Sequence, residues 1–324
     1  MDSLKIYSDT PFGEPALSLL KAAIEPHTLV FPERMAESVL GQSLAGPAIH
    51  DVDLIFGQPD VDAVLDARKL SWMHVSTAGY SRYDNPEFRH EMKARGVIVT
   101  NSSAVYANAC VEHFMAFLLA QNRQLLPNLS SDCANGSQEW FGLRESAVPL
   151  EGQELMILGY GTIAKRMIEC LAPYGMKITA MRRSPRGDEP VAMVTPDKVA
   201  EALGHADHVV NILPDNEDSF QFVNEDRLQQ MKVGAAFYNI GRGRTVDQKA
   251  LASALNSGQL NAAWLDVTDP EPLPPDHELR LAVNCHITPH TAGGHRAESE
   301  TLVRHFIENL QRYQLGKPLL NRII

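Results

Sequence analysis

One stretch organises the whole sequence: Leu155-Met156-Ile157-Leu158-Gly159-Tyr160-Gly161-Thr162-Ile163-Ala164. Its apolar residues predict a buried strand, and the glycines that follow predict a tight turn into a helix over about residues 161–174. In this GxGxxA pattern the first glycine permits the turn, the second lets backbone approach a pyrophosphate, and the small third residue lets helix pack on strand. The pattern predicts dinucleotide binding through Gly159, Gly161, Thr162 and Ile163, and the alternative is a turn without a ligand.

Short apolar runs alternate with helix-like stretches on both sides of this turn, as in βαβ units on a parallel sheet. The strand candidates are 4–8, 28–32, 52–57, 71–76 and 96–100 in the first part, and 154–158, 177–181, 208–213, 235–240, 262–267 and 284–288 in the second. The pattern predicts an α/β protein of two domains. One is a Rossmann-type doubly wound parallel sheet, and the other is a flavodoxin-like substrate (lid) domain.

The domain borders follow from two helical segments. Residues 102–123 form an uninterrupted apolar-periodic segment, which predicts one long buried helix with a domain crossing just before it. A last helix over 298–313 is expected to return to the first domain. We therefore expect a discontinuous lid domain of residues 1–102 and 293–324, and a dinucleotide-binding domain of residues 103–292. Polar residues 125–150 are expected to be irregular, with Trp140 and Phe141 as apolar anchors.

Composition narrows the class of protein. The 324 residues are 44% hydrophobic and 21% charged, which is ordinary for a globular protein, and the net charge of -11 argues against nucleic acid as a partner. No signal-like start and no apolar run of membrane-spanning length is evident, so we expect a cytoplasmic protein without a membrane partner. The four cysteines are scattered and are expected to be reduced thiols, and no histidine spacing suggests a metal.

The second strand of the dinucleotide domain ends in Arg182, Arg183 and Ser184. An enzyme that prefers NAD usually carries a carboxylate here, which binds the ribose hydroxyls, whereas guanidinium groups bind a 2′-phosphate. The sequence therefore predicts NADP(H), with NAD possible, and the alternative is that these arginines are solvated loop charges. The ends of later strands, at Leu213, Pro214 and Ile240, are expected to line the same cofactor.

Three residues just past predicted strand ends could perform acid–base chemistry on an anionic substrate. Arg242, between Gly241 and Gly243, suits a substrate carboxylate, and the glycines would let the backbone approach a ligand. His290 is suited to proton transfer and is also expected to contact the cofactor, while Glu271 would fix its tautomer and favour its charged form. Each residue alone is more often a structural or loop residue, and only their order on successive strand ends favours catalysis. His113, on the long helix, is the rival catalytic histidine, although its apolar surroundings favour packing.

Several segments resemble the D-isomer-specific 2-hydroxyacid dehydrogenases, notably their glyoxylate/hydroxypyruvate reductase branch. The resemblance covers Val99–Ser102, Val111–His113, Leu150–Gly152, Asn239–Gly243, Asp266–Pro274 and Thr288–His290. It implies NADP(H)-dependent reduction of a small 2-keto acid to the D-2-hydroxy acid by hydride transfer, with His290 as general acid. It also implies that Ala78 and Gly79 offer backbone amides to the substrate carboxylate and that Asp266 holds the nicotinamide carboxamide. The apolar helix over 104–124 and the Trp140–Phe141 excursion offer more apolar surface than one domain would easily cover, so we expect a homodimer built on the cofactor domain, as family members commonly form. Formate dehydrogenases of the superfamily carry Gln where this chain has Glu271, which argues against formate dehydrogenase activity.

The substrate loop departs from the family. Thr77-Ala78-Gly79-Tyr80 replaces the more usual Gly-Val-Gly-Tyr type of loop, so the keto acid stays open. One alternative is a reductase of a larger aromatic or aliphatic keto acid, with Tyr80 and Trp140 lining its pocket. Another is a dinucleotide-sensing binding protein of the corepressor kind, because sensors can retain the same three site residues.

Overall fold

The computed structural model describes residues 3–35 and 46–324, and its chain forms two compact units. The first unit comprises Met1–Tyr106 and Gly294–Ile324, and the second comprises Ala107–Gly293. Helix α4 (Ser103–Asn122) starts in the first unit and continues into the second. The sequence predicted borders after residues 102 and 292, and the units divide after residues 106 and 293.

The first unit is built on a five-stranded parallel sheet in the order β2-β1-β3-β4-β5, which is the flavodoxin-like order. Its strands are β1 (Lys5–Ser8), β2 (Thr28–Val30), β3 (Leu54–Phe56), β4 (Trp72–His74) and β5 (Ile98–Thr100). The helical segments are α1 (Glu14–Ile24), η1 (Pro47–Asp51), α2 (Val61–Asp66), η2 (Ser81–Tyr83), α3 (Pro86–Ala94) and α12 (Glu298–Gln314). Side-chain caps explain where two of them begin: Asp60 accepts from the first-turn amides of α2, and Asn85 does so for α3.

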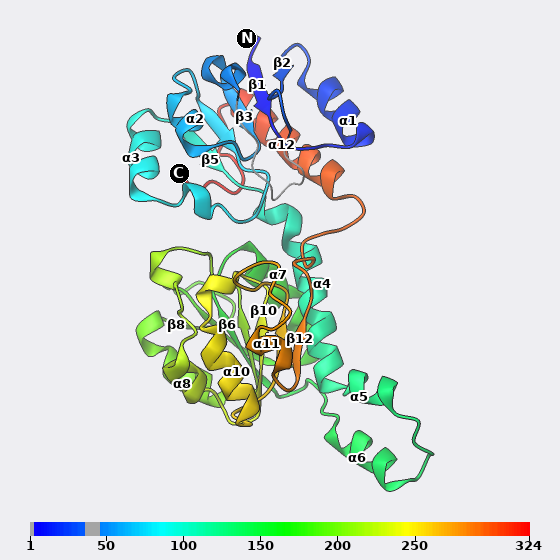
Figure 1. Ribbon diagram of the computed structural model, residues 1–324. Coiled ribbons are helices and arrows are strands. Elements are labelled where there is room, and N and C mark those ends of the chain that lie inside the picture. The colour runs from blue at the N-terminus through cyan, green and yellow to red at the C-terminus, as the bar shows by residue number, and fades with distance from the viewer. Residues whose placement is uncertain (1–2, 36–45) are drawn as a thin grey trace. The chain divides into compact units, whose positions relative to one another are not determined.

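The last helix, α12, completes the core of the first unit (Figure 1). Its Phe306 ring stacks on Phe56 and Trp72, with ring centroids 4.3 and 5.2 Å apart. All three side chains are fully buried. The first sheet therefore depends on a segment almost 200 residues beyond its last strand, Ile98–Thr100, because α12 begins at Glu298.

The second unit is built on a seven-stranded parallel sheet in the order β12-β11-β10-β9-β6-β7-β8. The strands are β6 (Glu154–Leu158), β7 (Lys177–Met181), β8 (Ala192–Val194), β9 (His208–Asn211), β10 (Ala235–Asn239), β11 (Leu260–Leu265) and β12 (Cys285–Ile287). Numbered along the chain, the order is that of a Rossmann-type doubly wound sheet, which confirms the predicted fold class. The sequence predicted six strands and missed β8, a three-residue edge strand that is only partly buried.

Short helices connect these strands. They are α7 (Thr162–Leu171), η3 (Ala172–Tyr174), η4 (Pro196–Lys198), α8 (Val199–His205), η5 (Glu217–Ser219), α9 (Glu225–Gln230), η6 (Gly243–Thr245), α10 (Gln248–Asn256) and α11 (Glu278–Leu281). Helix α7 buries Ala164, Met167, Ile168 and Leu171 along one face. That stripe explains why the chain turns into a helix here. Because all seven strands are parallel, their carboxyl ends lie along one edge of the sheet.

Two further predictions about the second unit were wrong. Residues 125–150 contain two helices, α5 (Leu125–Ser130) and α6 (Gln138–Ser146), and Figure 1 shows them standing clear of the sheet. Phe141 is 50% exposed and contacts Trp140, so neither ring anchors the segment in the core. Helix α4 is long and apolar enough to span a membrane by length and composition alone, contrary to expectation. Its Val111, Phe114 and Leu118 are nevertheless fully buried, as in a core helix.

Candidate active site

The turn after β6 has the geometry that the sequence predicted. Gly159 has a φ of +114°, and a Cβ there would lie 3.2 Å from the Ile212 side chain and 3.3 Å from its carbonyl oxygen, so only glycine fits. Gly161 caps α7 without a side-chain hydrogen bond, and a Cβ there would meet no atom within 4 Å. The space beside the helix N-terminus is therefore open to a ligand, where the helix dipole favours an anion.

A cavity of about 580 Å³ opens from this turn. Its lining is Gly159, Tyr160, Gly161, Met181, Arg182, Arg183, Ser184, Pro196, Ile212, Leu213, Pro214, Asn216, Asp218, Ser219 and Phe222. Seven of the predicted cofactor residues meet here, and its size and mixed lining fit a nucleotide. Thr162 and Ile163 begin α7 beside it, whereas Ile240, Asp266 and His290 are not part of its lining.

Two acidic residues that sequence reasoning missed pair with the arginines at the basic end of the cavity. Arg182 donates to Glu189 at 2.8 Å, and Arg183 pairs with Asp218 at 2.8 Å. The Arg182 and Glu189 side chains are 24% and 3% exposed, whereas those of Arg183 and Asp218 are 77% and 72% exposed. Arg182 is therefore not a free loop charge, whereas the Arg183 pair is largely exposed to solvent, and no local sequence signal showed either partner.

Arg242 follows β10 on a turn that a buried amide network holds. The Asn239 side chain accepts from the Gly241 amide at 3.0 Å and donates to the Arg242 carbonyl at 3.1 Å. Asn211 donates to Asn239 at 3.0 Å and to Thr245 at 2.6 Å. Burial lowers the pKa of Arg242, against the opposing effect of the Glu271 and Asp215 carboxylates. The guanidinium is thus partly desolvated, which strengthens its attraction for an anion.

Gly243 has a different role from the one expected. A Cβ on this residue would lie 2.1 Å from the Thr268 carbonyl carbon and oxygen and 2.6 Å from the Asp269 nitrogen. The missing side chain therefore lets the Arg242 turn pack directly on the backbone of Thr268 and Asp269, instead of leaving space for a ligand. That second segment leads into Glu271, so the contact joins two parts of the site.

His290 and Glu271 form the central pair. His290 Nδ1 lies 2.7 Å from Glu271 Oε2, and the other carboxylate oxygen accepts from the Thr268 amide at 2.9 Å. Burial raises the pKa of Glu271, but the hydrogen bonds from His290 and Thr268 outweigh it and leave that pKa below its ordinary value. The side chains of His290 and Glu271 are 28% and 36% exposed. The ring therefore has one nitrogen fixed by a carboxylate and the other, Nε2, available for chemistry.

Asp266 holds the backbone around His290. One carboxylate oxygen accepts from the Thr288 hydroxyl at 2.6 Å and from the Thr291 amide at 2.8 Å, and the other accepts from the Ala292 amide at 2.8 Å. His290 has a φ of +52°, a conformation that non-glycine residues rarely adopt. These bonds hold that conformation, so Asp266 has a positioning task besides the predicted contact with the carboxamide.

His113 lies behind this network. Its Nε2 is 3.2 Å from the Thr288 hydroxyl and 3.6 Å from an Asp266 oxygen, and its ring packs edge-on against Phe117. The histidine therefore supports the segment that carries His290. The predicted substrate residues Ala78 and Gly79 follow β4 in the first unit, where Asn101 and Thr77 bind their carbonyl oxygens at 2.7 and 2.6 Å.

Comparison with known proteins identifies the family. Residues 115–292, more than half of the chain, match the family model described as D-isomer specific 2-hydroxyacid dehydrogenase, NAD binding domain. A glyoxylate reductase of Aeropyrum pernix is 30% identical over 298 residues, which are 88% of this chain and 86% of the relative.

Two solved structures share the fold. A D-isomer-specific 2-hydroxyacid dehydrogenase of Xanthobacter autotrophicus, in complex with NADPH and MES, has a TM-score of 0.81 at 22% identity and covers 100% of this chain and 98% of its own. An NADPH-dependent glyoxylate/hydroxypyruvate reductase of Sinorhizobium meliloti, in complex with NADP and malonate, has a TM-score of 0.73 at 24% identity, with 99% and 97% covered. The chain belongs to the D-isomer-specific 2-hydroxyacid dehydrogenase family of oxidoreductases and carries that family's nicotinamide-dinucleotide-binding domain.

Proposed function

We propose that the protein reduces a small 2-keto acid of the glyoxylate or hydroxypyruvate type to the D-2-hydroxy acid, with NADPH as the preferred cofactor. The observation that carries this proposal is the 2.7 Å contact between His290 and Glu271 in the same unit as the dinucleotide turn. Arg242 supports it, since its charge affects the pKa of Glu271. Relatives named glyoxylate reductase add to it.

Each residue of the site has a distinct task. A bound nicotinamide supplies the hydride that reduces the keto carbon. Arg242 binds the substrate carboxylate, for which a partly desolvated guanidinium is well suited. Ala78 and Gly79 are the further candidates for substrate binding, through their backbone amides. His290 gives the proton on Nε2 to the keto oxygen, while Glu271 accepts from Nδ1 and stabilises the charged ring until the transfer.

The preference for NADPH rests on the basic end of the cavity. Arg182, Arg183 and Ser184 line it, and Glu189, the carboxylate beside them, has both oxygens engaged by protein donors. No carboxylate oxygen of Glu189 is left for the ribose hydroxyls that NAD presents. Two structures with the same fold hold NADPH or NADP.

A spectrophotometric panel tests the proposal. NADPH and NADH are each supplied with glyoxylate, hydroxypyruvate and phenylpyruvate, and absorbance loss at the nicotinamide band is followed. We expect turnover with the two small keto acids and a lower KM for NADPH. Fast turnover of phenylpyruvate alone would instead favour a larger substrate. Tight NADPH binding without turnover of any acid would favour a sensor. In the same assay, His290→Ala should lose most of the turnover. His90→Ala, at an exposed position of α3, is the matched control and should keep it.

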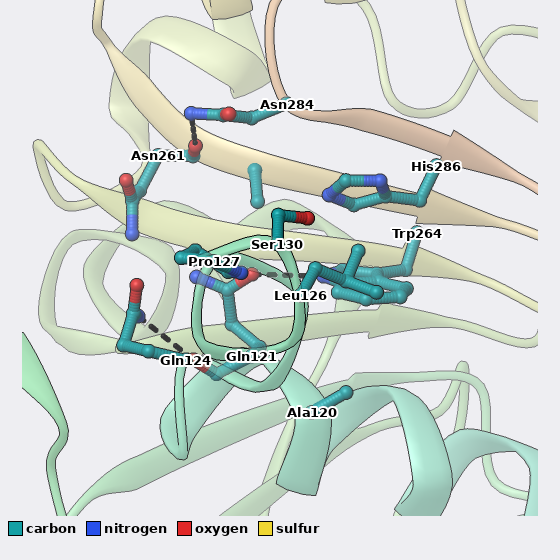
Figure 2. A pocket seen from close by; sticks show the side chains of 11 residues that line it. Ala120, Gln121, Gln124, Leu126, Pro127, Ser130, Asn261, Trp264, Asn284 and His286 are labelled. Atoms are coloured by element: carbon teal, nitrogen blue, oxygen red, sulfur yellow. Dashed lines mark hydrogen bonds between the residues drawn. The ribbon is translucent and has the colours of Figure 1, made fainter. Parts of the chain in front are cut away.

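We also propose a cytoplasmic homodimer built on the second unit. Helices α5 and α6 and the segment after them expose apolar side chains that one unit leaves uncovered: Leu125, Leu126, Leu129, Phe141 and Val148. A cavity of about 220 Å³ lies beside α5. Figure 2 shows Leu126 and Ser130 of α5 among its lining residues, together with Trp264 and His286 of the sheet. Four free cysteines suit a reducing compartment. Light scattering at micromolar concentration that gave the monomer mass would contradict the dimer.

A further inference from the structure

The Glu189 carboxylate is covered by its own loop and binds Arg182, which lines the basic end of the nucleotide cavity. Glu189 lies on the loop between β7 and β8, and its side chain is only 3% exposed. Carboxylates are rarely covered to this extent unless donors surround them. The neighbouring Asp188, by contrast, is exposed. Of these two adjacent acidic residues, the loop therefore covers Glu189 and leaves Asp188 in solvent.

Both oxygens of Glu189 are engaged. Oε1 accepts from Arg182 Nη1 at 2.8 Å and from the Arg186 amide at 2.9 Å. Oε2 accepts from the Gly187 amide at 2.8 Å and the Arg186 amide at 3.2 Å. The amide of Arg186, then that of Gly187 and the Arg182 guanidinium, lower the pKa of Glu189 to about 2. The carboxylate is therefore charged at any physiological pH. Its bonds to the amides of Arg186 and Gly187 hold the loop in a tight turn.

Arg182 is held on two sides by this arrangement. One side is the bond to Glu189, and the other is the Tyr160 ring of the dinucleotide turn, whose centroid lies 5.5 Å from the guanidinium carbon. Arg183 differs, because its partner Asp218 is as exposed as itself, and such pairs are held only weakly. Arg182 is thus fixed in place before any ligand arrives, whereas Arg183 is free to exchange Asp218 for another anion.

We propose that Glu189 is a positioning residue for 2′-phosphate selection: it fixes Arg182 and the 182–187 turn in the orientation that receives a phosphate on the adenine ribose. This inference rests on the proposed preference for NADPH. A guanidinium has five N–H donors, so the bond to Glu189 leaves most of them for a phosphate. Holding a long side chain in its bound orientation reduces the entropy lost when the ligand binds. The negative charge of Glu189 also weakens the attraction between Arg182 and a phosphate. This opposing effect is limited, because the backbone amides of Arg186 and Gly187 donate to the same carboxylate.

Binding of two fragments tests the inference without any turnover. Adenosine 2′,5′-bisphosphate carries the 2′-phosphate and 5′-AMP lacks it, and calorimetry measures the Kd of each. We expect the wild type to prefer the bisphosphate. Glu189→Gln should weaken the bisphosphate by about tenfold, the scale of one lost charge-assisted contact, and change 5′-AMP by less than about twofold. Asp188→Asn removes the same charge one residue away and should leave the preference unchanged.

A double-mutant cycle with Arg182 separates positioning from a general effect on the loop. Arg182→Ala should lower the bisphosphate preference by itself, and adding Glu189→Gln should then change little. Equal weakening of both fragments by Glu189→Gln would overturn the inference in favour of a purely structural role. Tighter bisphosphate binding would overturn it in favour of charge neutralisation.

The controls keep the outcomes distinct. If the wild type shows no preference for the bisphosphate, the proposed NADPH selectivity fails and the inference falls with it. If the wild type shows the preference and Glu189→Gln retains it, the inference alone fails. Circular dichroism checks folding. Should Glu189→Gln not fold, Glu189→Asp keeps the charge but draws it back by one methylene, and we expect an intermediate loss confined to the bisphosphate.

Discussion

Gly243→Ala should misalign the catalytic residues without altering the nucleotide cavity. The added methyl group would lie 2.1 Å from the Thr268 carbonyl carbon, whereas unstrained carbon contacts are about 3.5–4.0 Å. The two backbone segments must therefore separate by roughly 1.4–1.9 Å. One segment carries Arg242, and the other donates the Thr268 amide to Glu271. A displacement of about 1 Å in a site of this kind costs on the order of 10²-fold in rate.

Two measurements follow from that displacement. Overpacking of about 1–3 kcal/mol should lower Tm by about 2–12 °C, and kcat should fall by about 10²-fold with the proposed substrates. The Kd of adenosine 2′,5′-bisphosphate should stay within about twofold of the wild type, because its cavity is lined from other strands. Gly142→Ala in α6 is the matched control, since its Cβ would meet nothing within 4 Å. A Gly243→Ala enzyme with the Tm and kcat of the wild type would refute the reasoning.

The remaining predictions concern single side chains. His290→Ala should lower kcat by about 10²–10⁴-fold and leave NADPH binding intact, and near-normal turnover would return His113 to consideration. Glu271→Gln should make reduction fail at a lower pH than in the wild type, because the carboxylate that stabilises the charged imidazole is gone. The pKa of Glu271 is lower in the folded chain than its ordinary 4.5, so its contacts stabilise the fold above that pH and are lost as pH falls through the folded value. The free energy of unfolding of Glu271→Gln should therefore fall less than that of the wild type as the pH is lowered through this range. Asp218→Asn should tighten bisphosphate binding by about two- to fivefold at low salt by freeing Arg183, and an effect that persisted in high salt would contradict this exposed-pair explanation. Leu129→Asp, at a side chain that is 74% exposed, should give a folded monomer in light scattering, and an intact dimer would move the interface elsewhere.

Much of the fold and the central pair could be predicted because their signals are local. The strand before Gly159 and the helix after it lie in one continuous stretch, and alternating apolar runs report each βα unit. His290 and Glu271 lie 19 residues apart, yet each lies a few residues past a recognisable strand end, and parallel strands bring such ends to one edge.

The parts that sequence reasoning missed depend on pairings over longer distances. Asp218 meets Arg183 across 35 residues, and nothing in either segment identifies the other. Asn211 joins Asn239 across 28 residues, where an asparagine at a strand end reads as an ordinary turn residue. Gly243 looked like a glycine beside a ligand because sequence shows its flexibility and not the backbone of Thr268 that packs against it.

Because α12 belongs to the first unit, the two units become able to fold at different times during synthesis. The second unit is one continuous stretch, Ala107–Gly293, so a ribosome delivers all of it before residue 294 emerges. The first unit waits longer, because Phe56 and Trp72 lack the Phe306 ring that covers them until residue 306 has been made. The final residues also pair with β5, where the Ile323 amide donates to the Val99 carbonyl at 2.8 Å. The second unit can therefore fold during synthesis while the core of the first unit is still incomplete. Until then the exposed aromatic rings of Phe56 and Trp72 are surfaces that chaperones would bind.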